Sequence, residues 1–329
     1  MKYLVTGSSG HLGEALVRTL RVMGHEARGI DVLPSPCTEL VGSITDRELV
    51  RAAMTGVNAA LHSATLHKPH VATHSMQEFI DTNIGGTLVL LEEAVRAGVK
   101  TFVFTSTTSV FGDALRPPPT QPAAWVTEDV VPVPKNIYGV TKTAAEGLCE
   151  LFHKKHGLAC PVLRTSRFFP EQDDNAAVRS EFADANAKAN EFLYRRVDID
   201  DVVQAHLCAL ERAHAIGFDR FIISATTPFD YADLRELRTN APAVVARRVP
   251  EYADVYARLG WKMFAGIDRV YVNAKARQLL GWKPKHDFRE IIGRIERGED
   301  PRSALAIAIG SKGYHDEVFE DGPYPVEHR

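Results

Sequence analysis

Hydrophobic positions follow two alternating periods through the first half of the chain. Short apolar runs predict buried strands at 2–7, 26–31, 57–64, 100–107 and 159–166. Segments with hydrophobic residues three and four apart lie between these runs and predict helices at 11–24, 45–54, 75–97 and 138–156. Alternation of strands and helices is typical of a parallel sheet with helices on both faces. We therefore expect an α/β fold, a Rossmann-like doubly wound parallel sheet.

The alternation is interrupted by proline and weakens after residue 166. Residues 115–125 and 130–136 are rich in proline, which continues neither a helix nor a central strand. We expect an exposed excursion there. Further along, 197–213 predicts a short strand leading into a helix, and 218–224 predicts another strand.

Composition and charge exclude several classes of partner. The chain has 329 residues, is 45% hydrophobic and carries a formal net charge of −3, with its basic residues dispersed. This balance argues against nucleic acid or a membrane surface as a partner. The four scattered cysteines form no C-x-x-C motif, no apolar window is long enough to span a membrane, and the N-terminus lacks the pattern of a signal peptide. We expect a soluble, cytoplasmic protein.

A glycine-rich turn follows the first predicted strand and opens the first helix. "TGSSGHLGEAL" places Gly7, Gly10 and Gly13 in a G-x-x-G-x-x-G spacing, where backbone approaches a diphosphate closely. Asp31 ends the second strand 18 residues after Gly13, and a carboxylate there binds a ribose and repels a 2′-phosphate. This favours NAD over NADP. Because Arg28 lies nearby in the sequence, NADP stays an alternative.

The stretch "NIYGVTKTAAEG" sets Tyr138 four residues before Lys142. On a helix the two side chains share one face and can belong to one small site. Spacing alone leaves two interpretations open: a catalytic acid–base pair, or an aromatic residue and a charge on an ordinary helix.

In this order, the motifs resemble the extended short-chain dehydrogenase/reductase superfamily, specifically its NAD-dependent epimerase/dehydratase (nucleotide-sugar epimerase-like) family. "LLGWKPKHDFREII" (279–292) is similar to the C-terminal signature of that family. The resemblance implies NAD as the cofactor. It implies that the following residues contact NAD or line its site: Gly7, Ser9, Gly10, His11, Leu12, Gly13, Asp31, Ser43, Ile44, His62, Ser63, Ala64, Thr105, Ser106, Tyr138 and Lys142. It also implies that Asn83 braces the active-site strand.

The same resemblance assigns catalytic roles. Tyr138 becomes the proton-transfer residue, Lys142 its partner, and Thr107 the hydroxyl that orients the substrate. A tyrosine has an ordinary pKa near 10, and a cation one helical turn away favours the phenolate. We therefore expect Lys142 to lower the pKa of Tyr138.

Substrate residues are expected where the chain departs from the family pattern. Arg167 stands where nucleotide-sugar enzymes commonly have an asparagine, and an arginine there binds either a phosphate or the carboxylate of a uronate. His67 and Thr108 are the other candidates. The spacing of His67, His70 and His74 is compatible with a metal, but no acidic or cysteine ligand accompanies them, so we expect a polar loop and no metal.

These observations predict an NAD-dependent sugar or nucleotide-sugar epimerase that acts by hydride transfer at a secondary alcohol. A net NAD-dependent dehydrogenase of a uronate, another sugar or a bulky alcohol is the first alternative, and a non-catalytic NAD(H)-binding sensor is the second. We expect an NAD-binding unit of residues 1–165 with 197–225 and a substrate-binding lobe of 166–196 with 226–329. By family analogy we also expect a homodimer. The tail beyond residue 296 has no assigned role.

Overall fold

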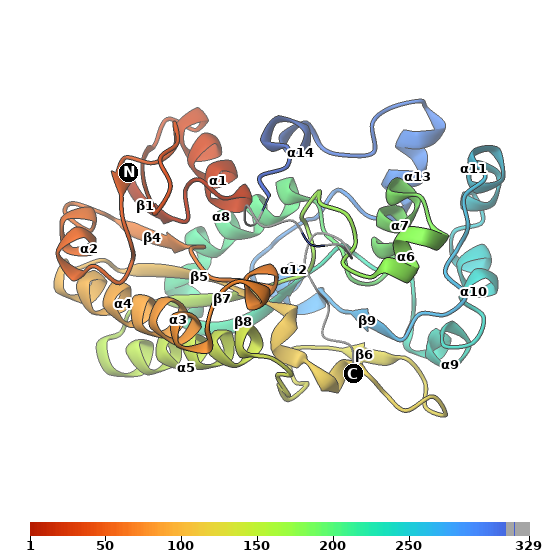
Figure 1. Ribbon diagram of the computed structural model, residues 1–329, viewed down its shortest axis with the longest axis horizontal. Helices are drawn as coiled ribbons and strands as arrows, with labels where there is room; N and C mark the ends of the chain where they lie inside the picture. Colours follow the sequence, from red (N-terminus) through yellow and green to blue (C-terminus); the bar gives the residue numbers. More distant parts are fainter. Residues whose placement is uncertain (314–318, 320–329) are drawn as a thin grey trace.

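The computed structural model describes residues 1–313 and residue 319. Its centre is a seven-stranded sheet in the order β3-β2-β1-β4-β5-β7-β8, in which every neighbouring pair is parallel (Figure 1). The strands are β1 (Lys2–Thr6), β2 (Glu26–Asp31), β3 (Leu40–Val41), β4 (Ala59–His62), β5 (Thr101–Thr107), β7 (Cys160–Thr165) and β8 (Phe218–Ile223). The predicted doubly wound α/β fold is confirmed.

Helices cover both faces of this sheet, as Figure 1 shows. One face carries α1 (His11–Val22), α8 (Ile199–Ile216), α12 (Ala274–Leu279) and α14 (Ala304–Ile309), and the other carries α2 (Arg47–Ala53), α4 (Thr87–Arg96) and α5 (Ile137–His156). Successive strand residues point to opposite faces. Val103 accordingly packs with the α1 and α8 side chains, whereas Phe102 and Phe104 pack with those of α4 and α5.

A second hydrophobic core lies beyond the sheet and contains Tyr256, Val270 and Phe288. The elements of this region are α6 (Ala176–Glu181), α7 (Asp184–Glu191), α9 (Leu234–Leu237), α10 (Ala241–Arg248), α11 (Tyr252–Leu259) and α13 (Phe288–Glu296). The exact boundaries of the two predicted units stay a prediction.

Three local features differ from the sequence prediction. The proline-rich stretch contains β6 (Ala124–Val126), which pairs in parallel with β9 (Arg269–Tyr271). Val126 is buried there because it packs in a hydrophobic cluster with Phe111 and Tyr271. The helix predicted at 75–97 consists of α3 (Met76–Phe79), a π-helical turn (Ile80–Gly86) and α4. The short strand predicted directly before α8 is not formed: in the described chain α7 is the element that precedes α8, and Arg196 between them forms an isolated bridge with Arg167.

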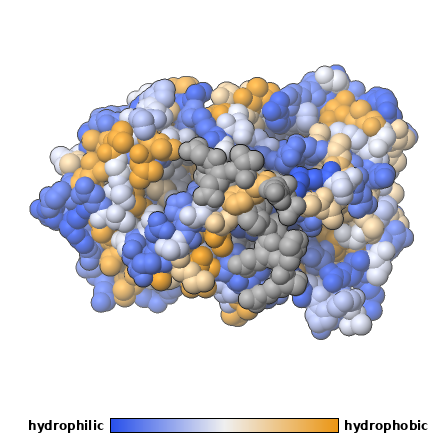
Figure 2. Space-filling view, in the orientation of Figure 1, coloured by the Kyte–Doolittle hydropathy of each residue, from blue (hydrophilic) through white to orange (hydrophobic). Residues whose placement is uncertain are grey.

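Hydrophobic residues on the face shown in Figure 2 are scattered in small groups among hydrophilic ones. Within the described residues, no helix has both the length and the apolar character needed to cross a membrane. The tail residues 314–318 and 320–329 lie outside the described part of the chain.

Candidate active site

A cavity of about 1050 Å³ opens at the carboxyl ends of the parallel strands. The segments that follow β1, β2, β4, β5 and β7 all contribute to its wall. Strand β1 lies between β2 and β4, at the point where the strand order reverses. Open α/β sheets bind ligands in the crevice at such a switch point. The cavity therefore occupies the position expected of a nucleotide site.

The glycine turn forms one end of this cavity. Gly7 has a φ of +72°, and a β-carbon added to it would lie 2.8 Å from the Ala64 amide nitrogen. A β-carbon on Gly13 would lie 1.8 Å from the Gly7 carbonyl oxygen, so only glycine fits there. Helix α1 begins at His11 after Gly10, and no described side chain caps it. A close-packed turn leading into an uncapped helix fits the diphosphate of a dinucleotide.

Asp31 lines the cavity at the end of β2. Its carboxylate accepts hydrogen bonds from the backbone N–H groups of Ser9 (3.0 Å) and Leu33 (2.9 Å), which fix it in place. Arg28 donates instead to Glu39 and to carbonyl oxygens at the end of α2. A fixed carboxylate with no arginine turned toward it fits NAD better than NADP.

Most of the predicted cofactor residues line the cavity. They are Gly7, Ser9, Gly10, His11, Leu12, Gly13, Asp31, Ser43, Ile44, Ser63, Ala64, Thr105, Ser106 and Tyr138. His62, Asn83 and Lys142 are not part of the lining. His62 is buried between the hydroxyls of Thr6 (2.8 Å) and Thr87 (3.0 Å), and burial lowers its pKa well below the usual value. It therefore joins β4 to β1 and α4 as a neutral side chain.

Asn83 occupies the π-helical turn between α3 and α4. Its side-chain oxygen accepts from Thr65 Oγ1 (2.9 Å) and Leu66 N (2.8 Å), and its nitrogen donates to Leu66 O (2.8 Å) and Thr141 Oγ1 (3.0 Å). These bonds brace the loop after β4 against α5, beside Lys142. Its partners lie in that loop and in α5 and not in β5, the strand that we expected it to brace.

Tyr138 and Thr107 come together at the cavity wall from different elements. Tyr138 lies in the first turn of α5, which Asn136 caps by accepting the Gly139 N–H at 3.0 Å, and Thr107 ends β5. Both side chains line the cavity, and Thr107 is close enough to act on the Tyr138 hydroxyl. Burial raises the pKa of Tyr138 to about 12, although Thr107 acts to lower it. Tyr138 is therefore a neutral phenol at neutral pH.

Lys142 lies behind the wall, one helical turn from Tyr138. Its Nζ donates to the Thr105 carbonyl oxygen at 2.7 Å and lies 4.1 Å from the centre of the Phe104 ring. Burial lowers its pKa to about 7, and the nearby Glu146 acts to raise it. The expected lowering of the Tyr138 pKa is wrong for this structure: burial raises that pKa, and Lys142 is not among the groups that lower it.

A buried ion network continues along the same face of α5, one turn beyond Lys142. Glu146 accepts hydrogen bonds from Ser106 Oγ (2.6 Å), from Arg164 Nε and Nη2 (3.0 and 2.8 Å), and from Arg220 Nε (3.0 Å). The network ties α5 to β5, β7 and β8. Sequence reasoning missed Glu146, although its spacing of four residues from Lys142 was an available signal.

Aromatic rings link the glycine turn to the loop after β4. His67 stacks on Phe169, with ring centres 5.5 Å apart, and Phe169 meets the ring of His11 edge-on at 5.4 Å. Burial lowers the pKa of His67 well below its usual value, so its imidazole is neutral. The rings of His67, His70 and His74 contact one another edge-on, with centres 4.5 and 5.2 Å apart. His67 and His70 both line the cavity, as does Thr108.

Arg167 also lines the cavity, but carboxylates surround its guanidinium group. It forms ion pairs with Asp173, Asp174 (3.2 Å) and Glu191 (3.1 Å). Burial acts to raise the pKa of Glu191, but neighbouring arginines, including Arg195, hold it well below its usual range. The Arg167 charge is thus compensated within the protein. This differs from the expectation that Arg167 binds the phosphate or carboxylate of a substrate.

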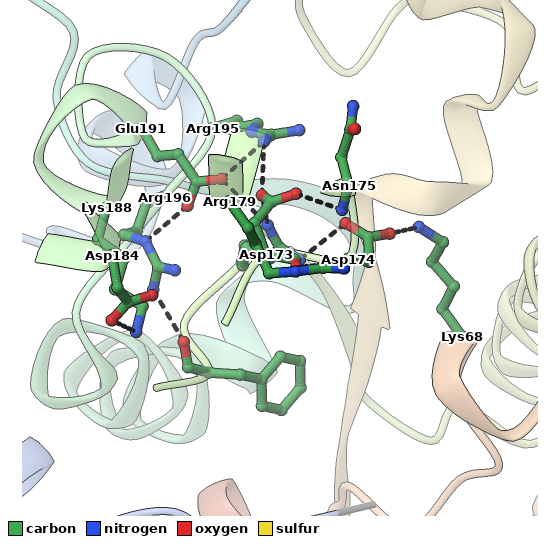
Figure 3. Close-up of polar contacts among 12 residues, drawn as sticks. Lys68, Asp173, Asp174, Asn175, Arg179, Asp184, Lys188, Glu191, Arg195 and Arg196 are labelled. Carbon is green, nitrogen blue, oxygen red and sulfur yellow. Dashed lines mark hydrogen bonds and ion pairs between the residues drawn. The ribbon is translucent and has the colours of Figure 1, made fainter. Parts of the chain in front are cut away.

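Figure 3 shows how this network extends from Asp173, Asp174 and Glu191 to further basic residues. Arg195 pairs with Asp173 (3.2 Å) and Glu191 (2.7 Å), Arg196 pairs with Glu191 (2.8 Å), and Lys68 pairs with Asp174. Sequence reasoning singled out Arg167 but missed its acidic partners, which belong to no motif.

Three other basic residues line the cavity and were also missed. Arg116 and Lys135 flank the proline-rich stretch, and Arg269 begins β9. Neither Arg116 nor Lys135 forms an ion pair with another described residue. Partial burial, followed by the charges of Arg116 and Lys68, lowers the pKa of Lys135, and the nearby Asp113 acts to raise it. Arg269 pairs with Asp268 at 3.5 Å, so the positive charge of this part of the wall is only partly compensated.

Comparison with known proteins gives the family. The model of the NAD dependent epimerase/dehydratase family matches residues 3–223, a span that contains the glycine turn, Thr107, Tyr138 and Lys142. The chain belongs to this family. The predicted membership, and NAD as the cofactor of the family, are confirmed.

Relatives of this NAD dependent epimerase/dehydratase family member differ in how much of the chain they share. It is 29% identical to a UDP-glucose 4-epimerase of Mycolicibacterium smegmatis, over 89% of this chain and 97% of that protein. It is 35% identical to an uncharacterised protein of Sinorhizobium fredii, over 49% of this chain but only 39% of that relative. A short-chain dehydrogenase/reductase superfamily protein from Agrobacterium tumefaciens, solved with NAD bound, shares the fold, with a TM-score of 0.63 and 24% identity over 94% of this chain and 99% of that one.

Proposed function

We propose that this family member is an NAD-dependent sugar epimerase that acts by hydride transfer at a secondary alcohol of a nucleotide sugar. One observation carries the proposal: Tyr138 and Thr107 line the same cavity as the glycine turn. A proton donor and acceptor beside a dinucleotide site is what oxidation and reduction of an alcohol require. The relative aligned over nearly its whole length is named a UDP-glucose 4-epimerase, which supports the same reaction class.

NAD, when bound, supplies the acceptor and then the donor of the hydride. In our proposal Tyr138 Oη takes the proton from the substrate hydroxyl and later returns it, while Thr107 holds the hydroxyl in position. Ionising a phenol whose pKa is about 12 at pH 7 costs roughly 7 kcal/mol. The protonated form of Lys142, one turn away, reduces this cost.

The charges of the cavity wall support an anionic substrate. Carboxylates compensate Arg167, so we infer that a substrate anion binds instead at Arg116, Lys135 and Arg269. The diphosphate of a nucleotide sugar offers more charge to this cluster than the single carboxylate of a uronate, and a neutral sugar offers none.

Lys135→Ala is expected to raise the KM for a nucleotide sugar about fivefold, with kcat within about twofold of the wild type. Lys135 is exposed, and one exposed ion pair contributes at most about 1 kcal/mol. Lys100→Ala is the matched control, because Lys100 is exposed and precedes β5, at the opposite edge of the sheet from the cavity. Steady-state kinetics at low ionic strength measure the effect, and an unchanged KM would remove Lys135 from the substrate site.

The function itself is tested with UDP-glucose as the probe. Purified protein loaded with NAD is expected to form the sugar epimer, detected by NMR, without net accumulation of NADH. Stoichiometric NADH production, from UDP-glucose or from free uronates, would establish the net dehydrogenase instead. Tight NAD binding without turnover of any nucleotide sugar or uronate in a panel would establish a sensor.

The homodimer and the cytoplasmic location stay predictions. The outer face of α5 exposes Val140 and Leu151, and Ile80 is exposed on the adjacent π-helical turn. These side chains support an interface built from helices, and the mass of the purified chain in solution measures it.

A further inference from the structure

The C-terminal segment 303–313 lies outside the family match, yet it packs firmly on the nucleotide-binding half. Ser303 caps α14, and its N–H and hydroxyl groups donate to the Asp198 carboxylate at 3.1 and 2.6 Å. Ile309, at the other end of α14, is buried in the core that contains Leu12 and Leu16 of α1. The segment is therefore anchored at both ends of its helix.

Beyond α14 the chain reaches the glycine turn. Gly310 has a φ of +64°, which a residue with a side chain rarely adopts. The Ser311 hydroxyl then donates to Glu171 at 2.7 Å. The Lys312 N–H also donates to Glu171, at 3.3 Å, and its nitrogen lies 3.1 Å from His11 Nε2. The Lys312 ammonium group pairs with Glu14 in the first turn of α1. Lys312 and Gly313 line the same cavity as the glycine turn.

These contacts compensate negative charge at the diphosphate end of the cavity. Glu14 is buried beside the start of α1, and Glu171 is largely buried against His11. Burial acts to raise the pKa of Glu171, but its bonds to His11 and Ser311 lower it to about 2, so it carries a charge. Two carboxylates near this site would repel a diphosphate. Lys312 reduces that repulsion by pairing with Glu14, which otherwise has only the half-exposed Arg18.

We propose that residues 303–313 form part of the NAD site and that Lys312 is a cofactor-binding residue that slows the release of NAD. The segment adds a wall beside the glycine turn, and the Lys312 charge, by compensating Glu14, removes a repulsion that an anion would otherwise meet there. This inference concerns the cofactor alone, so it stands or falls separately from the identity of the substrate.

Lys312→Ala tests the proposal. We expect the Kd for NAD to rise about tenfold, which corresponds to about 1.4 kcal/mol, mainly through faster release. Lys312→Arg is expected to restore binding to within about threefold. Lys154→Ala is the control, because Lys154 also pairs with a glutamate but lies on α5 away from the cavity. Calorimetry measures Kd, and stopped-flow NADH fluorescence measures release. The proposal is overturned if Lys312→Ala matches the wild type, or if Lys154→Ala weakens binding equally.

A second measurement uses the unaltered protein, in case Lys312→Ala folds poorly. Hydrogen exchange of segment 303–313 is compared with and without NAD. We expect the Lys312 and Gly313 amides to exchange more slowly with NAD bound, whereas equal exchange would contradict the proposal. The two proposals can fail separately. If the wild type produces NADH stoichiometrically while Lys312→Ala still releases the cofactor faster, epimerisation is refuted and the role of residues 303–313 in NAD binding is supported.

Discussion

Tyr138→Phe is expected to lower kcat about a thousandfold while the Kd for NAD stays within about threefold of the wild type. General acid–base catalysis typically contributes between a hundredfold and ten-thousandfold, and this substitution removes only the hydroxyl that transfers the proton. The ring keeps its place in α5, and Thr107 keeps the Ser109 N–H that its hydroxyl accepts at 3.1 Å. Single-turnover kinetics measure the chemical step, and calorimetry measures NAD binding.

Tyr231→Phe is the matched control for that experiment. Tyr231 is 72% exposed and packs edge-on against Trp125 outside the cavity, so the same loss of one hydroxyl there should leave kcat unchanged. Undiminished turnover in Tyr138→Phe would defeat the assignment of Tyr138. A parallel loss of NAD binding would show instead that the phenol hydroxyl is needed to hold the cofactor.

Features that were predictable from the sequence are local. The glycine turn and Asp31 each follow a strand directly, so their spacing fixes their position at the carboxyl edge of the sheet. Thr107 and Tyr138 similarly lie at the end of β5 and the start of α5, and strand–helix packing brings them together. For these residues, chain order and element type carry enough information to locate the side chain.

Features that were not predictable depend on distant partners. Arg167 has the expected position, but Glu191, 24 residues further on, compensates its charge. Lys312 reaches His11 across 301 residues, and no pattern in the tail indicates that contact. The pairing of β6 with β9 is equally remote in sequence. The degree of burial was also not predictable from the spacing of residues. Burial is the main cause of the shifted pKa values of Tyr138 and Lys142.

Lys142→Met is expected to abolish turnover and yet stabilise the fold at pH 6. Burial lowers the pKa of Lys142 from 10.5 to about 7, so the folded protein pays a penalty for the charged form. The unfolded chain holds this proton more tightly between pH 7 and 10.5, so the free energy of unfolding of the wild type rises with pH across that window. The penalty is complete below pH 7, where it amounts to roughly 5 kcal/mol, and it disappears above 10.5.

Methionine removes this penalty but also loses two favourable contacts of Lys142. The hydrogen bond to the Thr105 carbonyl and the interaction with the Phe104 ring together contribute roughly 2–3 kcal/mol. The net gain at pH 6 is therefore about 2 kcal/mol. It should become a loss of about 1 kcal/mol above pH 10.5, where Lys142 is neutral and methionine loses only the hydrogen bond. Urea unfolding at several pH values measures this crossover, with Lys154→Met as the control because Lys154 is exposed on the same helix. A variant that is less stable than the wild type at pH 6, or a difference independent of pH, would show that Lys142 is not destabilised by its burial.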